Sequence, residues 1–391
     1  MSNEDLRLVA PLVACGAIPK AAADECLRIW QALAKEGRAV SLTTVLVKKG
    51  VLTRTQAIVL SDAAVVQYQP FPNYKVLRRV GEGGMADVFE ATYAPLSARV
   101  ALKVLKTEFC LQEAYRLRFK REANILLHLD HPCIVEGREY ATHDGVDFYA
   151  MGFCEGISVL SILDAGVPIG EGLAVHAAAQ VADALEHMRQ RGIVHRDIKP
   201  GNLVLDAEGD VRIIDFGLAK VMSGMWQDVG SETTVGTVEY MPPEQARGES
   251  NVDSRADVYS LGVTLFQMVT GELPFQGSAA EVMYAHVKTA MEFTPAQKAK
   301  VSPQLQFILR KAMAKTPDER YPTPQALADD LRTLCAPAIA ARGPVPDLVA
   351  RASVEDAPIP VPAPIRPAAA RPGSSSGPHP SRNRPPYRRP R

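Results

Sequence analysis

The sequence of 391 residues lacks the features that mark disulfide-stapled, zinc-binding and membrane-spanning proteins. Its six cysteines are scattered with no Cys-x-x-Cys pair, which argues against a zinc site and a disulfide framework. No stretch approaches the roughly 18 consecutive apolar residues of a membrane helix, so we expect no transmembrane segment. The N-terminus is acidic, and no apolar segment with a small-residue cleavage site follows it. We therefore expect no secretory signal and a cytoplasmic location.

The chain also lacks net charge, because 44 basic and 44 acidic residues cancel. Nothing global steers such a protein toward nucleic acid, and we expect no nucleic-acid partner. Hydrophobic residues make up 47% of the chain and charged residues 23%, which is near the globular average. The length predicts two or three units, at least one of them with a sizeable core.

Residues 1–70 are predicted to form a small helical module of unknown role. Apolar residues recur at helical spacing, Thr53 and Gln56 fit a capping box, and Lys48-Lys49-Gly50 fits a helix end. We expect three or four short helices. Because no cluster of His, Cys, Asp or Glu there suggests chemistry, docking of protein partners or simple packing is the expected role.

Residues 336–391 hold 14 of the chain's 30 prolines and few large apolar residues. Such a segment cannot bury enough surface to offset its ordering entropy, so a disordered tail is predicted. From Arg366 onward it carries seven arginines and no acidic residue, which suits contact with acidic partners or lipid headgroups, although the pattern favours a solvated tail.

Residues 74–335 are predicted to form one α+β domain. Strand-like runs at 74–80, 87–91 and 99–105 surround a glycine-rich turn, and a helical pattern covers 112–129. Beyond that the apolar pattern becomes mainly helical. A small β-rich lobe before a larger α-helical lobe is the expected architecture.

The glycine-rich turn reads Val80-Gly81-Glu82-Gly83-Gly84-Met85-Ala86-Asp87-Val88. Missing side chains let backbone N–H groups close over phosphate oxygens, which makes the turn a candidate nucleotide-binding loop. A tight hairpin without any ligand explains the same pattern equally well.

A lysine follows on the next predicted strand, in Val100-Ala101-Leu102-Lys103. Strand alternation places Lys103 on the face opposite Leu102, where a lysine needs a counterion. Glu122, on the predicted helix, is a plausible partner, and the pair would hold the lysine amine toward phosphates. A solvated lysine at a strand edge is the alternative.

Two motifs carry a specific resemblance. His195-Arg196-Asp197-Ile198-Lys199-Pro200-Gly201-Asn202 is followed after a turn by Asp215-Phe216-Gly217. In this order and spacing after Lys103 and Glu122, the two motifs resemble those of the protein kinases. The resemblance is strongest to the eukaryote-like serine/threonine kinases of bacteria. The later Gly236-Thr237 and Pro243-Glu244, with Asp257 and Arg320, match that family's activation-segment end and structural anchors.

The resemblance implies a bilobal protein-kinase fold that transfers the γ-phosphate of ATP to Ser or Thr hydroxyls of protein substrates, with Mg²⁺ or Mn²⁺ as cofactor. It implies that Asp197 accepts the hydroxyl proton and that Lys199 stabilises the transferring group. It gives Lys103 and Glu122 the phosphate-positioning ion pair, and Asn202 and Asp215 the metal.

The same resemblance implies an ATP cleft between two lobes, with Met151 as gatekeeper. The other residues it assigns to nucleotide binding are the glycine-rich turn from Val80 to Val88, Lys103, and the adenine and hinge positions Ala101, Cys154 and Val204. Three departures stand out: the third loop glycine is Ala86, and glycines occupy two positions that the family usually fills with larger residues, Gly137 and Gly152.

The resemblance also implies a switch in the activation segment. Arg196 precedes the catalytic aspartate, and kinases with this arginine often pair it with a phosphate on the segment. Thr233 and Thr234 lie where relatives autophosphorylate, so they are the predicted phosphorylation sites. An unregulated polar loop is the alternative.

Two other function classes compete with an active protein kinase. A scaffold that binds ATP without turnover usually loses one key residue, and none is lost here. A phosphotransferase acting on small molecules shares the proton acceptor and the metal ligands but generally lacks the Gly-Thr…Pro-Glu segment. The stretch from Asp215 to Glu244 therefore favours a protein substrate. We expect residues 1–66 and the tail after Ala336 to be dispensable for basal catalysis.

Overall fold

The computed structural model describes residues 3–35, 40–60, 62–167, 169–216 and 238–338. Within these ranges, five helices precede the first strand: α1 (Asn3–Ala14), α2 (Lys20–Lys35), α3 (Leu42–Lys48), α4 (Arg54–Val59) and α5 (Asp62–Tyr68). The expectation of three or four helices was therefore too low. One break that the pattern did not resolve follows α1 at Gly16, whose φ of 72° suits glycine.

The helix signals in this segment are real caps. The capping box predicted from Thr53 and Gln56 is formed at the start of α4. Helix α3 ends at Lys48, and Gly50 follows in the left-handed region with φ of 69°.

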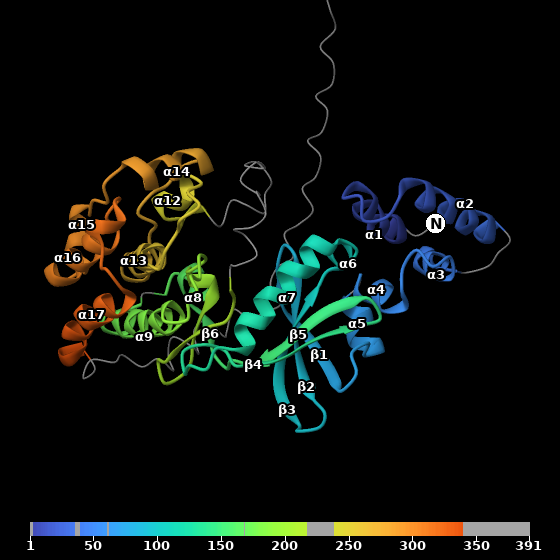
Figure 1. Cartoon of the computed structure of the whole chain (residues 1–391), viewed down its shortest axis with the longest axis horizontal. Coiled ribbons are helices and arrows are strands. Elements are labelled where there is room, and N and C mark those ends of the chain that lie inside the picture. The colour runs from blue at the N-terminus through green and yellow to red at the C-terminus, as the bar shows by residue number, and fades with distance from the viewer. Residues whose placement is uncertain (1–2, 36–39, 61, 168, 217–237, 339–391) are drawn as a thin grey trace, which may run out of the picture. The chain divides into compact units, whose positions relative to one another are not determined.

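An antiparallel sheet of five strands follows, in the order β1-β2-β3-β5-β4. The strands are β1 (Tyr74–Glu82), β2 (Ala86–Tyr93), β3 (Ala98–Leu105), β4 (Gly137–His143) and β5 (Val146–Gly152). Short turns join β1 to β2, β2 to β3 and β4 to β5. Each predicted run lies inside one of the first three strands. Between β3 and β4 come the short helix α6 (Thr107–Cys110) and α7 (Glu113–Leu127), which packs on β4 and β5 (Figure 1).

Glycine at position 137 has a packing cause. A Cβ added to Gly137 would lie 2.8 Å from the carbonyl carbon of Leu126 and 2.9 Å from the backbone N of Leu127. The strand β4 therefore approaches the backbone of α7 more closely than any larger residue would permit. The departure at this position accompanies a tight contact between α7 and the sheet.

The second lobe is mainly helical, and Figure 1 shows its helices gathered together. A small antiparallel sheet in the order β6-β7-β8 belongs to it: β6 (Ile157–Ser158), β7 (Leu203–Leu205) and β8 (Val211–Ile213). Its helices in the described ranges are α8 (Val159–Asp164), α9 (Glu171–Arg189), η1 (Pro200–Asn202), α12 (Pro243–Ala246), α13 (Arg255–Thr270), α14 (Ala279–Lys288), α15 (Pro295–Lys300), α16 (Pro303–Ala312), η3 (Pro317–Glu319) and α17 (Pro324–Ala338).

Helix α13 is the centre of this lobe. Nearly all of its residues are buried, among them the polar residues Asp257, Ser260 and Thr264. It packs against α9, α16 and α17. No helix in the described ranges is both long and apolar enough to cross a lipid bilayer.

Two apolar cores are present in the described residues. One is built by α1, α2 and α3 around Leu12, Trp30 and Leu46. The other runs through the sheet and the helical lobe, and it also includes Val59 of α4 and Val65 of α5. The last two helices of the N-terminal segment thus share the core of the domain that follows them.

Candidate active site

The glycine-rich turn joins β1 to β2 as a tight hairpin. The backbone N of Gly83 donates to the carbonyl of Ala86 at 3.0 Å, and a Cβ added to Gly83 would lie 2.7 Å from that oxygen. Glycine is therefore required at this position by the turn itself. The turn is also tied to the end of β3, because Lys106 N donates to Met85 O at 3.0 Å.

The side chain of Lys103 lies between two carboxylates. Its Nζ is 2.6 Å from Glu122 Oε1 of α7 and 2.5 Å from Asp215 Oδ1, which follows β8. The lysine is largely buried, and Glu122 is only 2% exposed. Three segments far apart in the sequence, β3, α7 and the turn after β8, thus meet at one amine.

Burial and charge oppose each other in this cluster. Burial alone would lower the pKa of Lys103, but the attraction of Asp215 and Glu122 raises it well above its usual value. Burial raises the pKa of Glu122 to about 7, although the positive charge of Lys103 lowers it. The lysine therefore stays a cation, which agrees with the phosphate-positioning role predicted for it.

The predicted catalytic loop folds around Asp197. Asn202 Nδ2 donates to Asp197 Oδ2 at 2.9 Å and to its backbone carbonyl at 2.8 Å, and Lys199 Nζ lies 2.9 Å from the same Oδ2. Pro200–Asn202 form the 3-10 turn η1, which brings Asn202 back toward Asp197. The loop thus places a carboxylate, an ammonium and an amide in contact.

A buried aspartate of α13 holds the backbone of this loop by hydrogen bonds. Asp257 of α13 accepts hydrogen bonds from His195 N at 2.8 Å and from Arg196 N at 2.7 Å. Arg196 has a φ of 66°, which is unusual for a residue with a side chain. The two bonds hold the loop in this conformation, in agreement with the bracing role implied by the resemblance.

His195 is fully buried beside the loop. Its Nδ1 accepts a hydrogen bond from Asp197 N at 3.2 Å, and its ring lies 5.2 Å from that of Phe216. Burial lowers the pKa of His195 to about 4, so the imidazole is neutral at physiological pH. It acts as packing and as a hydrogen-bond acceptor, not as a charge.

The two clusters are joined through the backbone. Ile214 N donates to the carbonyl of Asn202 at 3.0 Å, which fixes Asp215 next to the catalytic loop. Phe216 N donates to Asp215 Oδ1 at 2.9 Å. Lys103, Glu122, Asp197, Lys199, Asn202 and Asp215, six residues predicted from sequence, are therefore brought together.

The donor set fits a divalent metal held jointly with phosphate. Because both bonds of Asn202 to Asp197 use Nδ2, the amide oxygen Oδ1 is turned away from that carboxylate. Asp215 adds a carboxylate, and oxygen ligands of this kind suit a hard cation that completes its shell with phosphates and water. No cluster of three or more His, Cys, Asp or Glu able to hold a metal without such help occurs in the described parts of the chain.

The residues predicted to face adenine come from both sheets. Ala101 of β3 pairs with Met151 of β5, and Val88 of β2 pairs with Lys103. Val204 lies on β7 of the second sheet, and Cys154 follows β5 partly buried. The hinge position is held by the backbone, because Gly152 N donates to Glu136 O at 2.8 Å.

One buried ion pair ties the far side of the helical lobe. Arg320 donates through Nη1 and Nη2 to the two carboxylate oxygens of Glu244, each at 2.7 Å. Arg320 also donates to the carbonyl of Arg255 at 2.9 Å. This is the pairing that the resemblance implied for these two residues.

A tyrosine at the centre of the site was not predicted from the sequence. Tyr149 of β5 is buried, and its hydroxyl donates to Glu122 Oε1 at 2.6 Å. Burial raises the pKa of this tyrosine well above its usual value, so the hydroxyl keeps its proton. The alternation of Asp147, Tyr149 and Met151 along β5 was the available signal, since it places all three on one face of the strand.

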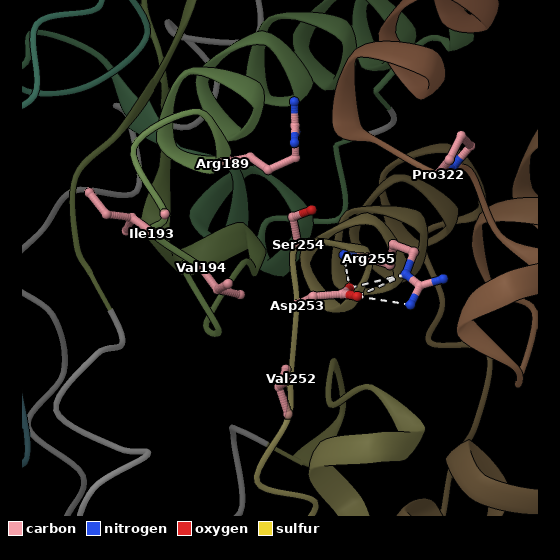
Figure 2. Close-up of a pocket in the computed structure, with 9 residues that line it drawn as sticks. Arg189, Ile193, Val194, Val252, Asp253, Ser254, Arg255 and Pro322 are labelled. Atoms are coloured by element: carbon pink, nitrogen blue, oxygen red, sulfur yellow. Dashed lines mark hydrogen bonds and ion pairs between the residues drawn. The ribbon is translucent and has the colours of Figure 1, made fainter.

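The predicted phosphorylation sites Thr233 and Thr234 fall outside the described residues. Figure 2 shows an open pocket at the start of α13, where Arg255 bonds to Asp253. None of the predicted site residues in the described ranges lines this pocket, and its other arginine, Arg189, pairs with Glu186 at 2.7 Å.

Comparison with known proteins places the domain. The family model described as "Protein kinase domain" matches residues 74–331. The chain is 37% identical over 268 residues to "Serine/threonine-protein kinase PknB" of Mycolicibacterium smegmatis, covering 66% of this chain and 42% of that protein. It is 34% identical over 261 residues to "Serine/threonine-protein kinase PrkC" of Bacillus subtilis, covering 66% and 40%. The chain thus spans about two fifths of the length of these relatives.

Solved structures agree with this match. The crystal structure of the Mycobacterium tuberculosis PknI kinase domain is 27% identical, with a TM-score of 0.51 over 67% of this chain and 96% of that one. A double mutant of the same domain gives a TM-score of 0.53 at 26% identity, covering 68% and 97%. The chain belongs to the protein kinase domain family, and the relatives it matches there are bacterial serine/threonine-protein kinases.

Proposed function

We propose that this protein transfers the γ-phosphate of ATP to serine or threonine hydroxyls of protein substrates. The observation that carries the proposal is the contact of Lys103 with both Glu122 and Asp215, beside the cluster of Asp197, Lys199 and Asn202. Phosphoryl transfer offers little covalent chemistry to a protein, so catalysis needs such an arrangement of positioned charges.

Each residue has a separate task in this proposal. Lys103 holds the α- and β-phosphates, and Glu122 keeps its amine in place. Asp197 accepts the proton as the substrate oxygen attacks the γ-phosphorus, and the bond from that phosphorus to the β-phosphate oxygen breaks to release ADP. Lys199 neutralises charge on the transferring group.

The glycine-rich turn from Val80 to Val88 would close over the phosphates, with Ala101, Met151, Cys154 and Val204 around the adenine. Asn202 Oδ1 and Asp215 would hold Mg²⁺ or Mn²⁺. When bound, the metal neutralises the phosphate oxygens.

The test of this function is phosphate transfer by the full chain from radiolabelled ATP to a generic basic protein. Asp197→Asn should abolish nearly all transfer and leave the melting temperature unchanged, because Asn keeps the size of the side chain and loses the proton acceptor. Wild-type turnover in this variant would defeat the assignment. Nucleotide binding without any transfer by the wild type would favour the scaffold alternative.

We also propose that phosphorylation of Thr233 or Thr234 activates the enzyme. Nε of Arg196 is buried and has no hydrogen-bond partner in the described part of the chain. A phosphate adds roughly 1.5 to 2 negative charges and three acceptor oxygens, which suit an arginine of this kind.

A reducing compartment such as the cytoplasm is the location we propose. The described cysteines Cys15, Cys26, Cys110, Cys133 and Cys154 are free thiols, as expected where disulfides do not persist. ATP is available there as well.

A further inference from the structure

Helix α4 and its N-cap form three hydrogen bonds to the turn between β4 and β5. Thr53 Oγ1 donates to the carbonyl of Asp144 at 2.6 Å, and Thr55 N donates to Asp144 Oδ2 at 3.0 Å. Gln56 Nε2 donates to the carbonyl of Gly145 at 3.2 Å. The residues of the capping box thus serve two purposes, because they start the helix and also hold the sheet.

The turn is shaped for this contact. Asp144 and Gly145 both have positive φ, 45° and 78°, as in a tight hairpin turn. A Cβ added to Gly145 would lie 3.1 Å from Gln56 Nε2 and 3.3 Å from the methyl carbon of Thr53. Helix and turn therefore fit closely.

The same helix holds α6. Thr107 is 1% exposed, and its Oγ1 donates to the carbonyl of Gln56 at 2.8 Å. That carbonyl is among the last four of α4, which have no partner within a helix. A buried donor on α6 thus satisfies a buried acceptor on α4, so separating the two would leave both groups unpaired.

A second contact reaches the connection between α6 and α7. Leu111, which lies between these helices, packs against the apolar core of α1, α2 and α3. The N-terminal segment therefore touches the kinase domain at both ends of α6.

Helix α6 is in turn coupled to α7. The rings of Phe109 and Tyr115 lie 4.7 Å apart, and Nε2 of Gln112, the N-cap of α7, donates to the carbonyl of Glu108 of α6 at 3.0 Å. Two turns further along α7 lies Glu122, whose carboxylate is 2.6 Å from Lys103 Nζ. A shift of α6 would therefore be carried along α7 to the ion pair.

We propose that α4 is a positioning element for the phosphate-binding lysine: by holding α6 and the β4–β5 turn, it fixes α7 where Glu122 meets Lys103. The residues of α4 act through Glu122 and touch no reacting atom. The predicted change in enzymatic activity rests on the proposed function. The predicted change in the position of α7 rests on the fold alone. It gives the helical segment ahead of the domain a task in the chemistry.

The test compares Thr107→Val with Thr107→Ser in the full chain. Valine keeps the shape of threonine and removes the hydroxyl, whereas serine keeps the hydroxyl. We expect T107V to lower kcat/KM for ATP roughly tenfold, as is typical of coupling between sites, and T107S to stay near wild type. Ser41→Ala is the matched control, because it removes a helix cap at Thr44 N inside α1–α3, away from α4.

Amide hydrogen exchange, measured without ATP, supplies a readout independent of enzymatic activity. T107V should accelerate exchange in α6 and α7 relative to α9, and T107S and S41A should not. This measurement separates the proposed kinase function from the positioning role of α4, since exchange reports the position of α7 even in a protein without kinase activity.

A double-mutant cycle tests the route. If α4 acts through Glu122, T107V should cause less than roughly twofold further loss in a Glu122→Gln background. A full tenfold loss there would overturn the proposal, as would wild-type exchange of α7 in T107V. If T107V fails to fold, Thr53→Val, which removes the hydrogen bond from the start of α4 to the carbonyl of Asp144, is judged by the same measurements.

Discussion

The hydroxyl of Tyr149 and the amine of Lys103 bind the same carboxylate oxygen, Oε1 of Glu122, each at 2.6 Å. The tyrosine comes from β5 and the lysine from β3, so two strands meet one residue of α7. Arg116 of α7 also pairs with Asp147 of β5, at 2.5 Å. Helix α7 is therefore fastened to β5 by two polar contacts on one face of the strand.

Tyr149→Phe should weaken ATP binding and slow transfer. The ring contact with Phe119, at 5.0 Å between centroids, is kept, but Glu122 loses a donor. Because that hydrogen bond lowers the pKa of Glu122 against the burial that raises it to about 7, its loss raises this pKa further. We expect KM for ATP to rise severalfold and the acid limb of the pH–rate profile to move to higher pH.

The control for this variant is Tyr115→Phe on the same helix α7. Tyr115 contacts Phe109 and Arg118 through its ring, which phenylalanine retains. Steady-state kinetics of both variants between pH 5.5 and 9 measure the shift of the acid limb. We expect this shift to be roughly one pH unit for Tyr149→Phe. Identical profiles for Tyr149→Phe and wild type would contradict the role given to the hydroxyl.

Arg320→Met should destabilise the fold strongly. The Arg320 side chain is fully buried and Glu244 is 4% exposed, so the variant strands a buried carboxylate. Removal of one partner from such a pair costs about 3–5 kcal/mol in the free energy of unfolding. Urea unfolding followed by circular dichroism measures this loss.

The double variant Arg320→Met/Glu244→Leu provides the contrast. It removes both charges, so it should recover part of the lost stability. Recovery should be incomplete, because Arg320 also donates to the carbonyls of Ala314 and Arg255. A double variant less stable than Arg320→Met would count against this account.

Stability should fall in acid partly because of His286. Its Nδ1 accepts from the Tyr259 hydroxyl at 2.8 Å, and its Nε2 donates to Glu239 O at 2.9 Å. Burial and the charge of Lys315 lower the pKa of His286 to about 4. Between the ordinary histidine pKa of about 6.5 and that value, the unfolded chain binds the extra proton, so stability rises with pH across this window.

The free energy of unfolding that is lost through protonation of His286 reaches up to about 3 kcal/mol by pH 4. His286→Gln cannot take up a proton, so its free energy of unfolding should depend less on pH between 6.5 and 4 than that of the wild type. Denaturant titrations at several pH values give this slope. Equal slopes for the two proteins would rule out His286 as the source.

Replacement of both Thr233 and Thr234 by alanine should lower activity severalfold without lowering the melting temperature. Mass spectrometry of wild-type protein incubated with ATP should find phosphate at one of these residues, and the Asp197→Asn protein should remain unmodified. Full activity in the double alanine variant would defeat the proposed switch and leave the kinase assignment intact.

The sequence predicted the fold class and the family correctly because the decisive motifs are dense and local. The short run from His195 to Asn202 contains the residues Asp197, Lys199 and Asn202 that contact one another in the structure. The strand runs at 74–80, 87–91 and 99–105 are likewise local signals, and each lies inside one of the strands β1, β2 and β3. Family and fold could therefore be predicted from the order of residues alone, and both predictions are confirmed.

What the sequence could not supply depends on contacts between distant segments. Tyr149 and Glu122 are 27 positions apart in the sequence, and the residues adjacent to either one do not indicate that the two side chains bond. The contact of Gln56 with Thr107 spans 51 positions. For the same reason the packing of Val59 and Val65 into the core of the kinase domain was not predicted. That residues 1–66 are dispensable for basal catalysis stays a prediction.

The sharing of one apolar core by α4, α5 and the sheet has a consequence for how the chain is divided. A fragment beginning at Tyr74, where the family match begins, would expose the surface that Val59, Val65 and Phe71 cover. Apolar patches uncovered in this way promote association between molecules. We therefore expect a fragment that begins near the capping box at Thr53, about twenty residues ahead of the family boundary, to associate less than one that begins at Tyr74.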